Sequence, residues 1–115
     1  MSDKSKVVVD LNVDPNVDPN TDKGDTIEYL VDLGVEMIWK NCSTHCPHFE
    51  IIFVGSSPAK PGDKLTGTLE QPVSLRMPKE KAKFFYKVHF QKKDGTRCID
   101  THTYSIRICP NGRPC

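Results

Sequence analysis

The chain has 115 residues, of which 37% are apolar, and its 16 lysines and arginines nearly balance 15 aspartates and glutamates. This length and composition predict one compact soluble domain and argue against a disordered chain or two domains. The balanced charge argues against a nucleic-acid-binding surface. The longest apolar runs, such as 51–54, are far shorter than the ~20 residues that a membrane-spanning helix needs.

The chain begins with a polar segment. Residues 1–5 are expected to be a flexible N-terminus, and Met1–Lys6 has no apolar stretch, so no signal peptide is predicted. The cellular compartment stays open. The first strand is predicted over Lys6–Val13.

A polar loop is predicted over residues 14–25, where Val-Asp-Pro-Asn occurs twice in succession. Its oxygen-bearing side chains have the alternate spacing of a calcium-binding loop. However, Pro19 stands where the sharp turn of such a loop needs glycine, so a solvated, turn-rich connection is the favoured interpretation. The residues with this spacing are Asp14, Asn16, Asp18, Asn20, Asp22 and Asp25.

The rest of the chain is typical of β-strands, because apolar and polar residues alternate with period two. The alternation is clearest over 83–91, where every second residue is a large apolar one. Six aromatic side chains on such faces are expected in the core: Trp39, Phe49, Phe53, Phe84, Tyr86 and Phe90. Counted with the first strand, about eight short strands result, the others being Thr26–Val31, Val35–Lys40, 49–54, Leu65–Thr68, Val73–Arg76, 83–92 and 97–108.

The last two strands are predicted to form an antiparallel hairpin around Asp94-Gly95, because glycine supplies the positive φ of a tight turn. Counting from that turn places Phe90 opposite Ile99. The apolar residues farther along, Tyr104, Ile106 and Ile108, then require one extra residue near 100–102, which predicts a β-bulge.

Three segments resemble the cupredoxins, a family of small Greek-key β-sandwiches best known for binding blue copper. They are Val31–Asn41 with its Trp39-Lys-Asn41 ending, His48–Phe53, and the closing hairpin from Phe85 to Ile108. The resemblance covers about residues 31–108. It implies that residues 1–115 form a single all-β domain, a Greek-key β-sandwich.

The resemblance breaks at the copper ligands. A blue-copper site uses two histidines, one cysteine thiolate and a weak axial ligand. Only His48 has a counterpart here, because Val88 stands in place of the cysteine and residues 91–98 contain neither histidine nor methionine. No blue copper is therefore expected.

The segment 42–48 concentrates metal-binding side chains, and in a cupredoxin-like sandwich it lies at the same end as the Asp94-Gly95 hairpin. Cys98 can then approach it and complete a mixed cysteine and histidine set for zinc or copper(I). The candidate ligands are Cys42, His45, Cys46, His48 and Cys98. His89 and His102 are weaker candidates.

The alternative interpretation is a disulfide from Cys98 to either Cys42 or Cys46. Cys98 and Cys109 cannot pair, because eleven extended steps of ~3.3 Å separate them by on the order of 36 Å. The tail 110–115 contains Pro-Asn-Gly, a turn that can bring Cys115 back to Cys109. We therefore predict Cys109–Cys115 and one free thiol among the five cysteines.

No catalytic motif is recognised. A cysteine and histidine nucleophile would also need an orienting group and oxyanion donors, and the sequence shows neither. The favoured hypothesis is a non-catalytic binding or accessory module without a cofactor, which acts on a protein or small ligand as a monomer or weak dimer. The alternative is a small metal-binding protein that uses residues 42–48.

Overall fold

The structure is a computed structural model that describes residues 6–11, 26–59, 65–98 and 103–115. The polar loop with calcium-like spacing, the N-terminal residues 1–5 and His102 lie outside the described residues. Every predicted strand has a counterpart, although residues 12–13 of the first and 99–102 of the last lie outside the described residues. The elements are β1 (Lys6–Leu11), β2 (Thr26–Val31), β3 (Glu36–Asn41), β4 (His48–Val54), β5 (Leu65–Thr68), β6 (Val73–Arg76), β7 (Ala82–Gln91), β8 (Arg97–Cys98), β9 (Thr103–Ile108) and a 3-10 turn, η1 (Pro110–Gly112).

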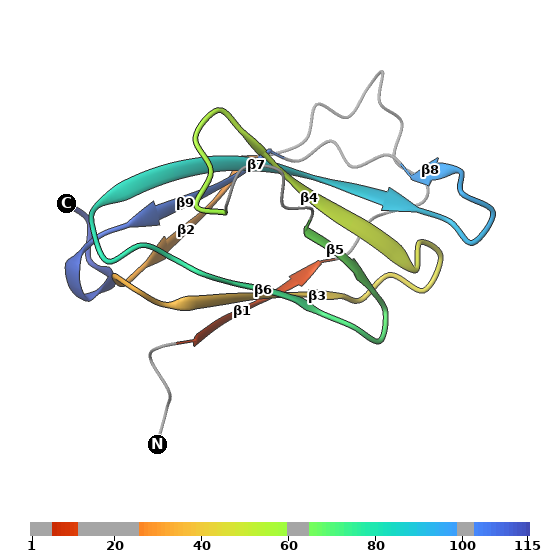
Figure 1. The fold of residues 1–115 in the computed structure, drawn as a ribbon, viewed down its shortest axis with the longest axis horizontal. Helices are drawn as coiled ribbons and strands as arrows, with labels where there is room; N and C mark the ends of the chain where they lie inside the picture. Colours follow the sequence, from red (N-terminus) through yellow and green to blue (C-terminus); the bar gives the residue numbers. More distant parts are fainter. Residues whose placement is uncertain (1–5, 12–25, 60–64, 99–102) are drawn as a thin grey trace.

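The strands form two layers (Figure 1). The smaller sheet has the order β1-β3-β6, and the larger sheet has the order β2-β9-β7-β4-β5, with β8 added beside β7. β1 pairs with β3, and β2 with β9, in parallel, whereas the other pairs are antiparallel. From β1 to β4, and again from β5 to β7, consecutive strands alternate between the layers, so most pairing partners are not consecutive in sequence. Among the described residues, no helix has the length and apolar character needed to cross a bilayer.

The core lies between the two sheets and is built on aromatic contacts. Tyr86 is fully buried, stacks on Tyr104 with ring centroids 5.0 Å apart and meets Trp39 edge to face. The Trp39 indole N–H donates to the Tyr86 hydroxyl over 3.1 Å, so a polar atom in the core is satisfied. Five of the six predicted core aromatics are buried, and Phe53 is half-buried against the core.

The hairpin between β7 and β8 forms as predicted, but its predicted register is wrong. Lys92 N–H donates to Thr96 O, and Gly95 N–H donates to Lys92 O, so the loop is one residue longer than a two-residue turn. Gly95 alone in this loop has positive φ, +88°, which matches a three-residue loop. Phe90 therefore pairs with Cys98 rather than with Ile99.

The register changes again along the returning strand. Phe90 pairs with Cys98 and Tyr86 pairs with Tyr104, so the chain advances four residues in β7 and six in the returning strand. Two extra residues are accommodated rather than the single one predicted. The predicted bulge at 100–102 lies outside the described residues, but Tyr104 points into the core as expected, at 4% exposure.

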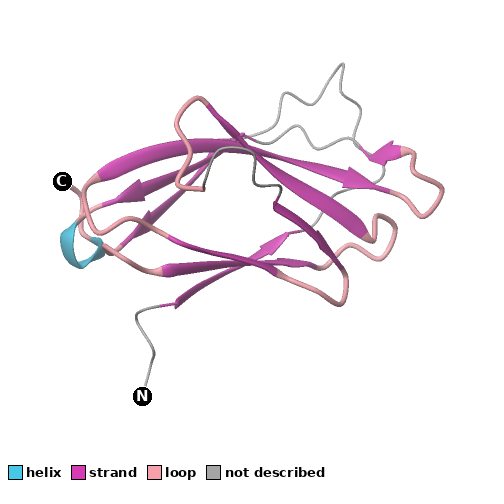
Figure 2. Cartoon of the chain, viewed as in Figure 1, coloured by secondary structure: helices cyan, strands magenta, loops and turns pink. Residues whose placement is uncertain are grey.

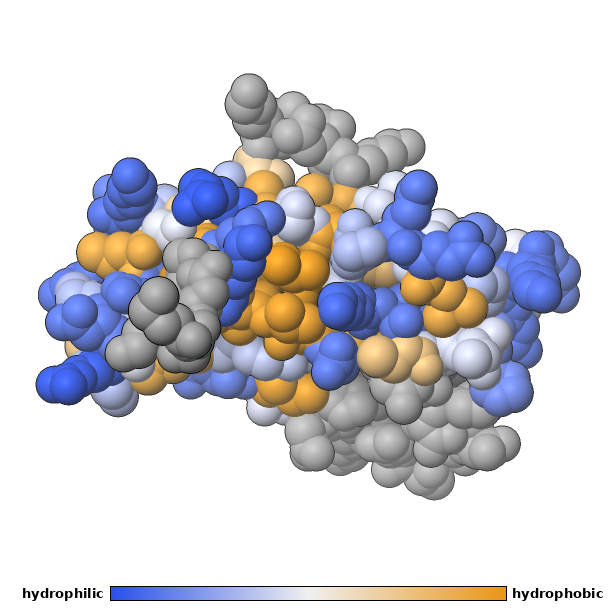
Figure 3. Space-filling model, turned by 90° about the horizontal axis from the view of Figure 1, so that it is seen from below, coloured by the Kyte–Doolittle hydropathy of each residue, from blue (hydrophilic) through white to orange (hydrophobic). Residues whose placement is uncertain are grey.

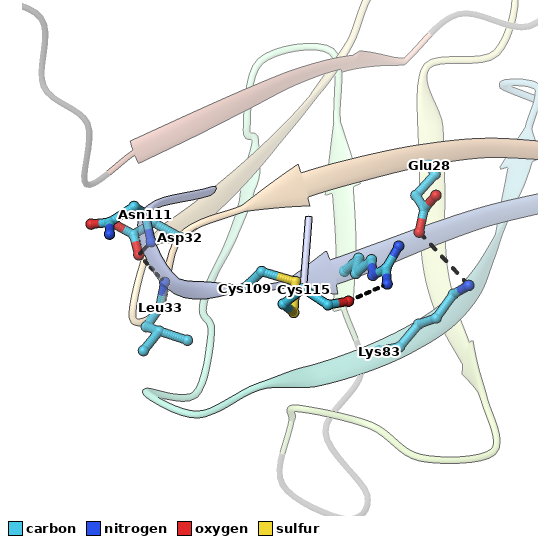
Figure 4. Close-up of a disulfide and its surroundings, with 8 residues drawn as sticks. Glu28, Asp32, Leu33, Lys83, Cys109, Asn111 and Cys115 are labelled. Carbon is cyan, nitrogen blue, oxygen red and sulfur yellow. Dashed lines mark hydrogen bonds and ion pairs between the residues drawn. A yellow bond between two sulfur atoms is a disulfide. The ribbon is translucent and has the colours of Figure 1, made fainter. Parts of the chain in front are cut away.

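One end of the sandwich is closed by the C-terminal turn (Figure 2). Asp32 Oδ1 accepts hydrogen bonds from Leu33 N–H and Asn111 N–H, over 2.7 and 2.8 Å, and so joins the β2–β3 turn to η1. Cys109 and Cys115 form the predicted disulfide, and the Arg107 guanidinium donates to Cys115 O over 2.6 Å (Figure 4). The side chains of Asp32 and Arg107 are thus engaged within the protein.

The outer face of the smaller sheet carries an apolar area in its middle (Figure 3). Val8 is 50% exposed and pairs in register with the half-buried Ile38. The neighbouring outward positions pair opposite charges, Lys6 with Glu36 and Asp10 with Lys40. A mixed face of this kind is ordinary for an exposed sheet.

Candidate functional site

The loop between β3 and β4 is held by Asn41 and by a disulfide. The Asn41 side chain donates to Cys46 O over 2.7 Å and accepts from Ser43 N–H over 2.8 Å. Cys46 is bonded to Cys98, with Cα atoms 6.6 Å apart, so the loop is tied to β8 just after the β7–β8 hairpin. The disulfide alternative is confirmed, with Cys46 as the partner of Cys98.

The other predicted ligands in this segment do not converge. Cys42 is an exposed free thiol, and His45 is also exposed. His48 is exposed at the start of β4, where the neighbouring Phe49 points into the core. Across the described ranges, no group of three or more His, Cys, Asp or Glu side chains is placed to hold a metal ion.

His48 instead begins the floor of a cleft on the outer face of the larger sheet. Register places Thr68 of β5 and Gln91 of β7 on either side of it. Two residues farther along β4, Thr66 and His89 flank Glu50 in the same way. The site therefore has two rows of polar side chains across three strands, and the rows are ~6.6 Å apart along the strand direction.

The cleft has a volume of about 680 Å³ and is walled by two connections. The β5–β6 turn contributes Gln71 on one side, and the β7–β8 hairpin contributes Lys92, Lys93 and Arg97 on the other. Figure 1 shows this hairpin projecting beyond the end of the sheet, beside the β3–β4 loop. The Cys46–Cys98 disulfide joins these two segments.

The floor is supported by a close approach between β4 and β5. A Cβ on Gly67 would lie 2.5 Å from the Phe49 ring and 2.8 Å from Gln71 O, so only glycine fits here without a shift. The Phe49 ring can therefore pack beneath the site, with its centroid 6.5 Å from that of Phe90.

Charge is unevenly distributed around the cleft. The hairpin supplies three cationic side chains, whereas Glu50 is the one carboxylate among the lining residues that the structure describes. The hairpin itself carries Asp94, whose carboxylate accepts from Thr96 N–H over 2.9 Å. This hydrogen bond, with a smaller effect of Lys92, lowers the pKa of Asp94. Asp94 does not line the cleft.

Sequence reasoning missed most of this site. It identified His48, and it placed His89 on the polar face of its strand. It did not identify Glu50, Thr66 or Arg97, because each alone resembles an ordinary solvated residue. The available signal was positional, since outward polar residues of β4, β5 and β7 gather once the strands pair in this register.

Comparison with known proteins identifies the type of fold but gives no function. No protein-family model matches the chain, and no curated protein is significantly similar to it. A solved structure of an oxidised amicyanin variant, with lysine in place of a methionine, matches with a TM-score of 0.53 at 21% identity, covering 95% of this chain and 86% of that one. A second amicyanin variant, in the Cu(I) form, matches with a TM-score of 0.48 at 17% identity over the same shares.

Amicyanin is a cupredoxin. Taken with the two-layer strand arrangement, the first of these matches defines the fold as a cupredoxin-like β-sandwich, as the sequence predicts.

Proposed function

We propose that this protein is a non-catalytic binding or accessory module, and that it holds a polar ligand in the cleft over β5, β4 and β7. The observation that carries the proposal is the convergence of polar side chains from three strands and a hairpin on one concavity. Its volume of about 680 Å³ falls in the range of about 300–1,000 Å³ that is typical of small-ligand sites.

The site is also preorganised. Its floor residues sit on paired strands, and the hairpin wall is fixed to the β3–β4 loop through Cys46–Cys98. A ligand that binds here does not have to order the segments that contact it, which reduces the entropic cost of binding.

Blue-copper chemistry is not part of the proposal, because the described residues do not fit such a site. Cys46 and Cys98 are bonded to each other, and the buried Val88 offers no ligand atom at the position where the family has its cysteine. His48 lies on the outward face of β4, where its cross-strand partners are Thr68 and Gln91, and no thiolate is among the described lining residues of the cleft. Copper(II) added to the oxidised protein should give no intense visible absorption, and an intense blue band would contradict this part of the proposal.

The cysteine nucleophile considered from the sequence is not part of the proposal either. The described lining residues include neither serine nor cysteine, and the exposed Cys42 lies outside the cleft.

A thermal-shift screen tests the proposal. A ligand that binds only the folded state raises its melting temperature, so a panel of neutral, anionic and cationic polar compounds should include at least one that stabilises the protein. Thr66→Trp, which fills the cleft from β5, should abolish the shift. Ser56→Trp, at an exposed position outside the cleft, should keep it. If no compound shifts the melting temperature, or if Thr66→Trp leaves the shift unchanged, the proposal is wrong.

The second candidate function is metal binding by the cysteine and histidine residues in the reduced protein. It is favoured by the Cys46–Cys98 disulfide, since reduction would leave two thiols side by side, one of them in the segment that also contains Cys42 and His48. Thiolate ligands must lose protons, so zinc affinity should fall steeply with acid. The test compares melting of the reduced protein with zinc and with a chelator, and identical curves would eliminate this function.

A further inference from the structure

We propose that the ligand of the cleft is a small molecule or peptide segment with clustered carboxylates, which bind at the hairpin end of the site. This inference rests on the proposed function, because it names the chemistry that the same cleft selects. Its basis is the arrangement of charges around the cleft.

The first observation is the local excess of positive charge. The whole chain is nearly neutral, with 16 lysines and arginines against 15 aspartates and glutamates. The described lining of the cleft has Lys92, Lys93 and Arg97 against the single carboxylate of Glu50. An anion is therefore attracted to this part of the surface and not to the protein as a whole.

The second observation is that two of these cations have no ion-pair partner among the described residues. Lys93 and Arg97 are exposed and form no ion pair within the described part of the chain, whereas Lys92 interacts with Asp94. The guanidinium of arginine has the fork geometry that binds a carboxylate through two parallel hydrogen bonds. Arg97 and Lys93 can thus hold two acidic groups that lie close together.

The third observation is the position of Glu50, which orients the ligand. The row of His48 with Gln91 lies next to the hairpin, and the row of Glu50 with His89 lies farther along the strands. An anionic group over Glu50 would be repelled, so the carboxylates bind at the hairpin end, with Gln91 able to donate from its amide. A hydroxyl or amine of the ligand then fits over Glu50, ~6.6 Å away along the strand.

Calorimetric titration of the oxidised protein at low ionic strength tests this inference. Citrate and a tetraglutamate peptide are the anionic probes and distinguish a free polycarboxylate from an acidic peptide segment. Sorbitol, putrescine and inorganic phosphate are the comparison probes. At least one carboxylate probe should bind more tightly than all three comparison probes, and its affinity should fall as salt is added.

Charge-reversed variants locate the binding. Lys93→Glu with Arg97→Glu should weaken binding by about tenfold or more, because two attractions become repulsions at short range. The control is Lys81→Glu with Arg113→Glu, which makes the same change in net charge at exposed positions outside the cleft and should leave the affinity within about twofold. Glu50→Gln should tighten citrate binding, since it removes the repelling carboxylate.

The outcomes separate this inference from the proposed function. If sorbitol, putrescine or phosphate binds as tightly as the carboxylates, if both double variants weaken binding equally, or if no probe binds while a compound of the thermal-shift panel stabilises the protein, the carboxylate inference is wrong. Whether the cleft binds a ligand is then decided separately by the Thr66→Trp variant in the thermal-shift screen. If no probe binds and no compound of the thermal-shift panel stabilises the protein, both are wrong.

Discussion

The two ends of the sandwich are each tied by a disulfide, but they differ in how their polar groups are used. At the C-terminal end, Asp32 and Arg107 are engaged with backbone groups of the η1 turn and the last residue (Figure 4). At the end of the β7–β8 hairpin, Lys93 and Arg97 face a cleft without a partner among the described residues. Polar groups that satisfy one another hold a fold together, whereas convergent polar groups left open to solvent are available to bind a ligand.

The largest expected difference between the ends is in the stabilisation that each disulfide provides. Cys46 and Cys98 are separated by 52 residues, and Cys109 and Cys115 by six. Loop-closure entropy predicts stabilisation of about 4 kcal/mol for the longer loop and about 2 kcal/mol for the shorter one.

The comparison uses two serine double variants, Cys46→Ser with Cys98→Ser and Cys109→Ser with Cys115→Ser, both in a Cys42→Ser background that prevents exchange with the free thiol. Denaturant unfolding gives the free energy of each. Equal losses, or a larger loss at the C-terminal end, would contradict the dependence on loop length. The first variant should also weaken binding in the cleft, because its hairpin wall is released.

The support beneath the cleft can be tested at Gly67. Gly67→Ala should destabilise the protein by about 1–3 kcal/mol, as overpacked sites do, because its Cβ would overlap the Phe49 ring and Gln71 O. Gly55→Ala is the control, since a Cβ there meets nothing within 4 Å and only the positive φ of +81° is unfavourable. The alanine at position 67 should shift the aromatic resonances of Phe49 and Phe90, and the control should not. If both variants lose stability without such shifts, the packing argument fails.

The closed end can be tested at Asp32. Asp32→Ala removes an acceptor used by Leu33 N–H and Asn111 N–H and should reduce the free energy of unfolding by about 1–2 kcal/mol. Asp32→Asn keeps an oxygen acceptor and should retain most of that stability. Ligand affinity in the cleft should be the same in both variants. A change in affinity would show that the ends are not independent.

The smallest effect concerns Asp94 in the hairpin. Its pKa is lowered in the folded protein, mainly by the hydrogen bond from Thr96 N–H. A lowered folded-state pKa means that this contribution to stability is present above the unfolded-state pKa and is lost as the pH falls through the folded value. Carboxyl carbon shifts recorded over an acid titration should give a midpoint below that of aspartate in an unstructured peptide. A midpoint at or above that value would show that the turn is not held by this hydrogen bond.

The strands were predictable because they show a local alternation of apolar and polar residues. The alternation in 83–91 is present in the sequence itself, and β7 spans Ala82–Gln91. The hairpin register was not predictable from Asp94-Gly95 alone, because that pair suits both a two-residue and a three-residue loop. The longer loop is defined by the backbone hydrogen bonds of Lys92 and Gly95, which the sequence does not specify.

The candidate site was less predictable than the fold. The reactive residue types in segment 42–48 suggested a metal site there. In the structure, Cys46 of that segment instead forms the disulfide that ties the loop to β8. The cleft depends on which strands become neighbours. β4 lies between β5 and β7, so Thr66 and His89, 23 residues apart in sequence, flank Glu50. A single sequence does not contain that arrangement as a local pattern.

The central claim is that the hairpin end binds the ligand and the C-terminal end is structural. Amide nitrogen and proton shifts of the labelled protein, recorded during titration with citrate, test both parts in one experiment. We expect progressive, saturable shifts at Gln91, Lys93 and Arg97, with Asp32 and Asn111 unchanged. Shifts centred on Asp32 and Asn111, or small shifts spread evenly over both ends without saturation, would contradict it.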